Sequence, residues 1–158
     1  LHASAAALTP NVAPAFGLSI EDEGGDDYDL QIEEAAELFA NPLMRRCVTL
    51  CLPSMGMGPS QHICESTELV NLRQFDFPDN EAGPHIELVA SPTFANLRWA
   101  NFHNSDSAAD CPSIVPLAER PHLANLEYLD FGDCEQGREG AYAVATATHW
   151  NRLRYLNL

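Results

Sequence analysis

The 158-residue sequence contains no lysine: all eight of its basic residues are arginine, against 23 aspartate and glutamate residues. The resulting formal net charge of −15 opposes binding to nucleic acid or to an anionic membrane surface, because contacts with phosphate need clustered cations. We therefore expect neither partner. A solubilising acidic surface with a base-composition bias toward arginine explains this balance, and a salt-adapted source is the alternative.

Long hydrophobic runs are missing as well, since no stretch approaches the roughly 18 apolar residues that a membrane span requires. The N-terminus lacks the basic region of a secretory signal. The five cysteines are an odd number without paired spacing, which favours a reducing compartment over a disulfide framework. We therefore expect a cytoplasmic protein, and a length of 158 residues with 46% hydrophobic content allows one domain with a core.

One spacing of apolar residues recurs along the chain. In the stretch from Leu123 to Cys134, LANLEYLDFGDC, we take Leu126 as the anchor; apolar residues lie three before it, at it, and three and five after it, and a small polar residue follows eight after it. The other anchors are Cys47, Leu72, Leu97 and Leu153, with a fainter copy at Ala15, and the separations from residue 47 onward are 25, 25, 29 and 27 residues. Such a repeat predicts units that stack and share one core, because a single unit cannot bury its own apolar face.

Each unit is expected to contain a short strand, a turn and a short helix. The strands are predicted at a faint Val12–Ile20, at Met44–Leu52, and around each later anchor. A helix is predicted over Leu30–Ala40, with Asp29 as its cap and Pro42 as its stop. Further helices are expected at Pro59–Ser66, Pro84–Ala90, Pro112–Ala118 and Glu139–Thr148. Residues 1–11 are expected to form a frayed lead-in, such as the end of a helix.

The stretches LVNLRQFDFPDN and LANLEYLDFGDC resemble the LxxLxLxxN and LxxLxLxxC patterns of leucine-rich repeats. Repeats of 25 to 29 residues with helical returns resemble the ribonuclease-inhibitor-like class, and GREGAYAVA is similar to the helix of bacterial, planctomycete-type, leucine-rich repeat proteins. Asn80 and Cys134 match the position whose side chain satisfies backbone groups of the turn; Ser105 is a weaker match and Met55 departs from the pattern.

This resemblance implies an α/β solenoid, or horseshoe, of about five to six strands, with a concave parallel sheet and convex helices. Residues 1–43 would be an N-terminal lead-in with a degenerate first repeat and an acidic loop. Residues 44–158 would be leucine-rich repeats truncated at the C-terminus, so that the chain is a piece of a longer protein.

The outward strand positions are the candidate functional surface. Strand alternation turns the second and fourth residues after each anchor outward, and the resemblance implies exposure of the first as well. Tryptophan, tyrosine and arginine dominate the hot spots of protein interfaces. We therefore predict a protein-protein interaction module with an unknown partner protein, whose binding residues are Trp99, Tyr128, Tyr155, Arg73, Arg98, Arg154, Asp76 and Asp130.

Two alternatives remain open. The columns of aromatic, arginine and aspartate or asparagine residues are also what a well-paired sheet face would contain, since neighbouring strand residues contact each other in any sheet. The chain could equally be a structural repeat segment of a larger multidomain protein with no independent ligand.

Catalytic and metal-binding patterns are weak. The six histidines show no recognisable spacing from a serine or cysteine nucleophile, and the stretch Met55–Ser60 lacks the lysine of a phosphate-binding loop. We expect no enzyme activity, no cofactor and no small-molecule substrate. The acidic loop Glu21–Asp29 does not fit a twelve-residue calcium loop. Cys47 and Cys51 are predicted to point to opposite faces of a strand, so zinc would need ligands from several repeats. No metal site is predicted.

Overall fold

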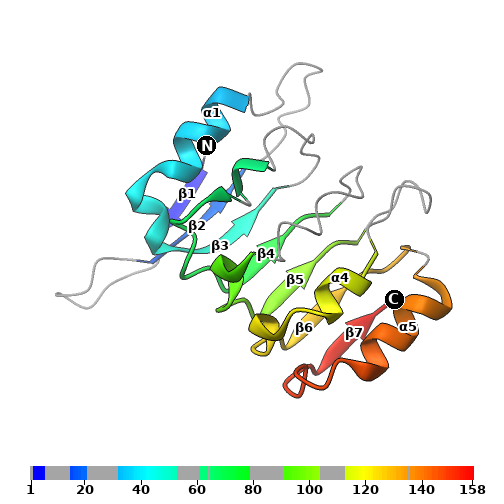
Figure 1. The fold of residues 1–158 in the computed structure, drawn as a ribbon. Coiled ribbons are helices and arrows are strands. Elements are labelled where there is room, and N and C mark those ends of the chain that lie inside the picture. Colours follow the sequence, from blue (N-terminus) through cyan, green and yellow to red (C-terminus); the bar gives the residue numbers. More distant parts are fainter. Residues whose placement is uncertain are drawn as a thin grey trace.

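The computed structural model describes residues 2–5, 15–20, 32–52, 61–63, 65–78, 91–103, 113–134 and 136–158. One seven-stranded sheet runs through these residues, and each strand lies next to its neighbour in the sequence (Figure 1). The strands are β1 (His2–Ala5), β2 (Phe16–Ser19), β3 (Cys47–Cys51), β4 (Gln74–Asp76), β5 (Trp99–Asn101), β6 (Tyr128–Asp130) and β7 (Tyr155–Asn157). Strands β2 to β7 are parallel, and β1 pairs antiparallel with β2. The protein is therefore α/β with a parallel sheet, as predicted.

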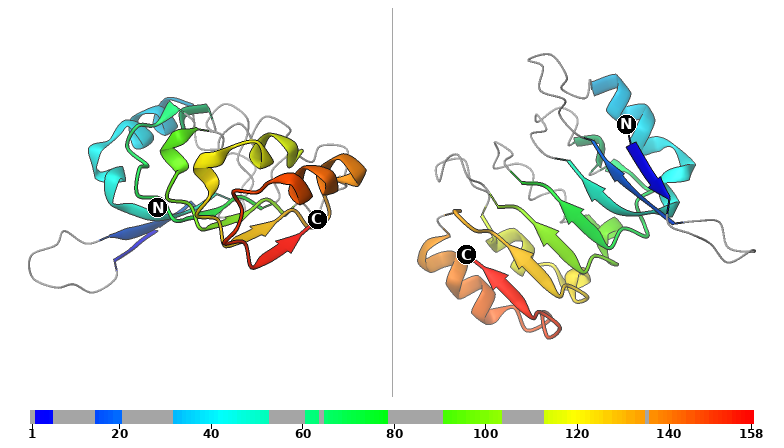
Figure 2. Two further views of the ribbon diagram at one scale, coloured as in Figure 1. Left: turned by 60° about the horizontal axis from the view of Figure 1, so that its bottom comes forward. Right: turned by 180° about the vertical axis from the view of Figure 1, so that it is seen from behind.

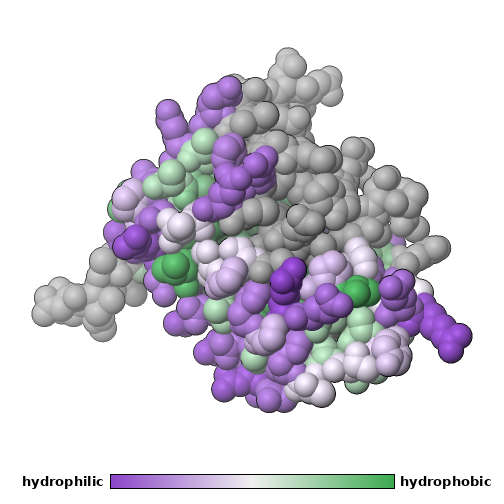
Figure 3. All heavy atoms as spheres, in the orientation of Figure 1, coloured by the Kyte–Doolittle hydropathy of each residue, from purple (hydrophilic) through white to green (hydrophobic). Residues whose placement is uncertain are grey.

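The helices lie on one face of this sheet. Figure 2 shows α1 (Ile32–Ala40), α4 (Val115–Ala118) and α5 (Gly137–Thr146) on the same side of the strands. The helix side that faces the viewer in Figure 3 is mostly hydrophilic among the coloured atoms, with hydrophobic side chains in separate places. We call the other surface of the sheet, formed by the first, second and fourth residues after each anchor, the open face.

The core lies between the sheet and the helices, and the anchor spacing places its residues. The anchors Cys47, Leu72, Leu97 and Leu126 are buried, and the residues three positions later line up in one buried row across the sheet, Leu50, Phe75, Ala100 and Leu129. Phe75 contacts other rings of the core, with its centroid 5.3 to 6.1 Å from those of Phe77, Phe94 and Phe102. The inward positions predicted from the repeat are confirmed for the anchors at residues 47, 72, 97 and 126. In the last copy Leu153 and Leu156 are only half-buried and Leu158 is 43% exposed, and the faint anchor Ala15 is exposed.

The strands begin at or after the anchors, and not at the apolar residue three positions before them: β3 begins at its anchor, and β4 to β7 begin two residues after theirs. Residues of the 3₁₀ turns η1 (Pro42–Arg46), η3 (Pro92–Phe94) and η4 (Pro121–Leu123) occupy the approach to β3, β5 and β6. Proline begins each turn, where its missing N–H costs no hydrogen bond, and Asn41 and Ser91 accept the backbone N–H two residues on. The predicted strand start at Met44 is therefore wrong, because Met44 is buried inside η1 and the strand begins at Cys47.

The other local predictions have mixed outcomes. Residues 2–5 form β1, so the expectation of a helix end there is wrong. The helices near residues 30–40, 112–118 and 139–148 exist, with α5 beginning two residues earlier than predicted. Residues 61–63 and 65 are helical, within the range expected for Pro59–Ser66. Asp29, the acidic loop and the helix Pro84–Ala90 lie outside the described residues.

Asparagine side chains join consecutive units on the side where the strands begin. The residue before the anchor donates its Nδ2 hydrogen to a backbone carbonyl of the previous unit, with Asn71 bonded to Arg45 O at 2.7 Å, Asn96 to Val70 O at 2.8 Å, and Asn125 to Ala95 O at 3.0 Å. Sequence reasoning missed this row, although its signal is visible as an asparagine directly before three anchors. Each bond fixes the position of one unit against the next.

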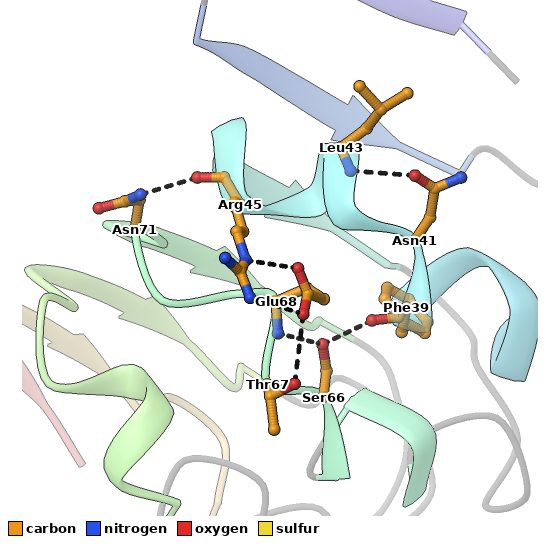
Figure 4. A network of polar contacts seen from close by, with 8 residues as sticks. All are labelled: Phe39, Asn41, Leu43, Arg45, Ser66, Thr67, Glu68 and Asn71. Atoms are coloured by element: carbon orange, nitrogen blue, oxygen red, sulfur yellow. Dashed lines mark hydrogen bonds and ion pairs between the residues drawn. The ribbon is translucent and has the colours of Figure 1, made fainter.

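A denser polar network connects α1 and η1 with the following unit (Figure 4). The buried Ser66 hydroxyl donates to Phe39 O at 2.6 Å and accepts from Glu68 N at 3.2 Å. Glu68 accepts two hydrogen bonds from the Arg45 guanidinium, at 2.6 and 3.2 Å. The hydrogen bond from Arg45 lowers the pKa of the Glu68 carboxyl. The hydrogen bond from Ser66 to Phe39 O thus joins α1 to the following unit, and the Arg45–Glu68 pair joins η1 to it.

Candidate functional site

The register of the sheet aligns the predicted columns. The second residues after the anchors pair strand by strand in the order Thr49, Gln74, Trp99, Tyr128 and Tyr155. The fourth residues pair in the order Cys51, Asp76, Asn101, Asp130 and Asn157. Both columns lie on the open face, because alternation along a strand separates them from the buried row between them.

The aromatic column is a continuous stack. The rings of Trp99 and Tyr128 have centroids 4.9 Å apart with planes 16° apart, and those of Tyr128 and Tyr155 are 4.2 Å apart and 3° from parallel. Trp99 and Tyr128 are half-buried, and Tyr155 is 43% exposed. The stack forms a rigid apolar ridge across three strands, exposed most at its Tyr155 end.

The arginine row extends the sheet by one position. Backbone N–H groups of Arg73, Arg98, Glu127 and Arg154 each donate to the carbonyl of the corresponding residue in the previous strand, at 2.8 to 2.9 Å. Arg98 pairs with Glu127 at 3.6 Å and its side chain remains 54% exposed. Arg73 and Arg154 are exposed and form no side-chain ion pair with any residue in the described part of the chain. Both of these arginines are thus exposed to solvent.

The aspartates of the fourth position are predicted as binding residues, but their carboxylates accept hydrogen bonds within the sheet. Asp130 is only 8% exposed, and its carboxylate accepts from Gly132 N at 2.8 Å, Tyr128 Oη at 2.9 Å, Asn157 Nδ2 at 3.0 Å and Tyr155 Oη at 3.4 Å. Asp76 accepts from Asn101 Nδ2 at 2.8 Å and from the Cys51 thiol at 3.6 Å. Asp130 therefore holds the two tyrosines of the ridge in place, and little of it is open to a partner.

Burial and hydrogen bonding have opposing effects on the pKa of Asp130. Burial raises the pKa of the Asp130 carboxyl, but hydrogen bonds from Gly132, Tyr128 and Asn157 outweigh burial and leave the pKa below its ordinary value. Burial raises the pKa of Tyr128, and its bond to Asp130 raises it further. At neutral pH the neutral hydroxyl of Tyr128 is therefore bonded to an ionised Asp130.

Gly132 makes room for this cluster. A Cβ atom at residue 132 would lie 2.7 Å from His103 Nδ1 and closer still to Asn157 Nδ2. A larger residue there would have to displace the side chains that surround Asp130. His103 also approaches Asp133, with Nε2 and Oδ2 3.4 Å apart. Neither Gly132 nor His103 carries a sequence pattern that reveals this contact.

A shallow hollow lies beside the arginine row. It has a volume of about 320 Å³ and is lined by Glu127, Asn151, Arg152, Leu153 and Arg154. Arg152 reaches Asn125 Oδ1 at 3.2 Å, so its guanidinium is oriented by the asparagine row. No role is predicted for Arg152 from the sequence, because it lies before the anchor Leu153 and the predicted outward positions all follow the anchors.

The cysteines behave as the strand alternation predicts. Cys47 is buried and Cys51 is half-buried on the open face, and burial raises the pKa of the Cys47 thiol to about 11. The thiol of Cys134 donates to Phe102 O of the previous unit at 3.6 Å, as the leucine-rich repeat pattern implies for this position. Asn80, Ser105 and Met55 lie outside the described residues.

The described residues contain neither a metal-binding cluster nor a membrane-spanning helix. They contain no group of three or more histidine, cysteine, aspartate or glutamate side chains arranged to hold a metal ion. In the same ranges, no helix has the length and apolar character to cross a membrane. Comparison of the chain with protein-family models, with curated proteins and with solved structures gives no match.

Proposed function

We propose that the chain is a leucine-rich repeat solenoid of the ribonuclease-inhibitor-like class, and that its open face is the concave surface on which another protein binds. Three features support the fold: parallel strands in sequence order, the buried row of Leu50, Phe75, Ala100 and Leu129, and the Cys134 thiol bonded to Phe102 O of the previous unit. Together they meet the requirement that each unit share its core with its neighbours.

The observation that carries the binding function is the ridge of Trp99, Tyr128 and Tyr155 beside two exposed arginines, Arg73 and Arg154, that form no ion pair with another described residue. Tyrosine, tryptophan and arginine contribute most of the energy in protein interfaces. Because the stacked rings are already fixed by each other and by Asp130, a partner that packs on them loses little additional side-chain entropy. The ridge is therefore preorganised for contact.

The alternative is a sheet face whose residues only pair with one another. The Arg98–Glu127 contact and the bonds around Asp130 fit this interpretation. It leaves unexplained why Arg73 and Arg154 have no ionic partner among the described residues and why the last ring of the stack is 43% exposed. We therefore favour a binding surface.

The test is a pull-down from lysate of the source cells, with the bound proteins identified by mass spectrometry. The parent chain is compared with an Arg73→Ala/Tyr155→Ala variant, which alters two exposed residues of the open face. The matched control is Arg138→Ala/Tyr142→Ala, which alters an exposed arginine and a 70% exposed tyrosine on α5. Circular dichroism verifies that all three fold.

We expect a protein that the parent and the α5 variant retain and the open-face variant loses. Equal retention by all three would move the contact away from the open face. If the parent retains no protein, the structural-segment alternative holds.

A further inference from the structure

We infer that the partner presents an acidic, extended segment that crosses the strands and pairs its carboxylates with Arg73 and Arg154. This inference rests on the proposed function, since it specifies the chemistry of the partner that the open face binds. The inference is motivated by three of the eight arginines lying in one row on the open face of a chain whose net charge is −15.

The charges of the open face are separated along the strands. The first position after the anchor, directly before β4, β5, β6 and β7, contributes three arginines and one glutamate, and that glutamate, Glu127, already pairs with Arg98. The acids Asp76 and Asp130 stand three residues further along their strands, which is about 10 Å at the usual rise per residue. That distance is about one screening length at physiological salt, so the arginine row keeps a local positive potential.

The geometry of the row defines the spacing of the segment. Arg73 and Arg154 lie directly before strands β4 and β7, three strand intervals apart, which amounts to about 14 Å at roughly 4.8 Å for each interval. An extended chain covers this distance in about four residues at roughly 3.4 Å each. Because alternate residues of an extended chain share one side, the matching pattern is acid, any, apolar, any, acid. The apolar residue in the middle falls beside Trp99 and Tyr128.

Near Arg154, the surface hollow described above can accept one carboxylate of the segment. Arg154 and Arg152 both line the hollow of about 320 Å³, which is large enough for a side chain and lies at the lower end of the range of small-molecule pockets. Arg152 is oriented by Asn125, and the negative Glu127 on its wall is partly neutralised by Arg98. A carboxylate in this space would meet two guanidinium groups, which form charge-assisted hydrogen bonds with carboxylates.

The experiment selects binders to the full chain from a phage-displayed random-peptide library. Enriched sequences are expected to carry two acids four residues apart with an apolar residue between them. Synthetic peptides are then titrated by fluorescence anisotropy. Arg73→Glu and Arg154→Glu should each weaken binding by about tenfold or more, which corresponds to the loss of one hot-spot residue. Glu127→Gln should strengthen binding, because it frees Arg98.

One control tests where the peptide binds, and another tests whether its acidic charge is required. Arg138→Glu, on the exposed surface of α5, should leave affinity unchanged. Arg154→Gln replaces the charge-reversed variant if circular dichroism shows that the latter is unfolded. A peptide with lysine in place of its acids should bind the parent weakly and Arg73→Glu/Arg154→Glu better.

The two failures are distinguishable. Enrichment of basic or uncharged peptides whose binding is lost in Tyr155→Ala would overturn the acidic segment while leaving the open face as the binding surface. Absence of enrichment, or peptides that bind every open-face variant as well as the parent, would overturn both the inference and the proposed function.

Discussion

Replacing Asp130 with alanine should destabilise the fold more than its position on a sheet surface suggests. The carboxylate is 8% exposed and accepts four hydrogen bonds, from one backbone N–H and three side chains of two strands. Alanine removes every acceptor at once. The tyrosine hydroxyls can turn to solvent, because they belong to partly exposed residues, whereas the Gly132 N–H is buried.

The expected magnitude follows from these different outcomes. A buried donor left without an acceptor costs about 1–3 kcal/mol, and a hydrogen bond to a charged group contributes about 1.5–3 kcal/mol. Because the four bonds share one carboxylate, their contributions do not add. We expect Asp130→Ala to lower the free energy of unfolding by about 2–4 kcal/mol. Asp130→Asn keeps the shape and one acceptor, so it should cost less than half as much.

Urea denaturation followed by circular dichroism measures both changes. The matched control is Asp133→Asn, which removes an exposed charge paired with His103 and should change stability by no more than about 1 kcal/mol. Absorbance titration gives a second readout, since loss of the carboxylate should lower the pKa of Tyr128. An Asp130→Ala variant as stable as the Asp133→Asn control, with an unchanged tyrosine titration, would refute the assigned role of Asp130.

Three further predictions concern stability. Phe75→Ala should lower the free energy of unfolding by about 3–5 kcal/mol, because it empties the centre of the aromatic core; a urea midpoint close to the parent's would contradict this packing. Asn96→Ala should cost about 0.5–1.5 kcal/mol through its lost bond to Val70 O, and Asn151→Ala, an exposed asparagine outside the row, should cost less. Burial and the charge of His122 lower the pKa of His149, so its stabilising effect is present above a pH of about 6.5 and is lost as the pH falls below it.

The measurements for these variants are thermal or urea melts at matched pH. For the histidine, the decline of stability between neutral and mildly acidic pH should be shallower in His149→Gln than in the parent. Equal slopes in the two proteins would show that other groups control this range. If Asn96→Ala and Asn151→Ala lowered the free energy of unfolding equally, the bond from Asn96 to Val70 O would have no specific stabilising effect.

The strand register could be predicted from the sequence because two simple regularities determine it. Apolar residues at fixed distances from each anchor must enter one core, and alternation then places the second and fourth residues after the anchor on the other face. The alignment of Trp99, Tyr128 and Tyr155 required no further information.

The polar contacts were less predictable because they depend on atoms brought together by the fold. Asp130 becomes buried only when hydroxyls from its own strand and from the next strand reach it. Asn96 is visible before its anchor, but its acceptor is a carbonyl 26 residues earlier. The strand at His2–Ala5 contains no large apolar residue, so its sequence shows no alternation that would distinguish a strand from a helix end.

The differing lengths of the units have a consequence for how such a chain can change. Anchor separations of 25, 25, 29 and 27 residues coexist with strands β3 to β7 that pair without any register shift. The extra residues are thus absorbed in the connections, whereas one residue inserted into a strand would exchange its inward and outward sides. Evolution or design can therefore lengthen the connections without disturbing the register, while substitution at the three outward positions of each unit changes the chemistry of the open face.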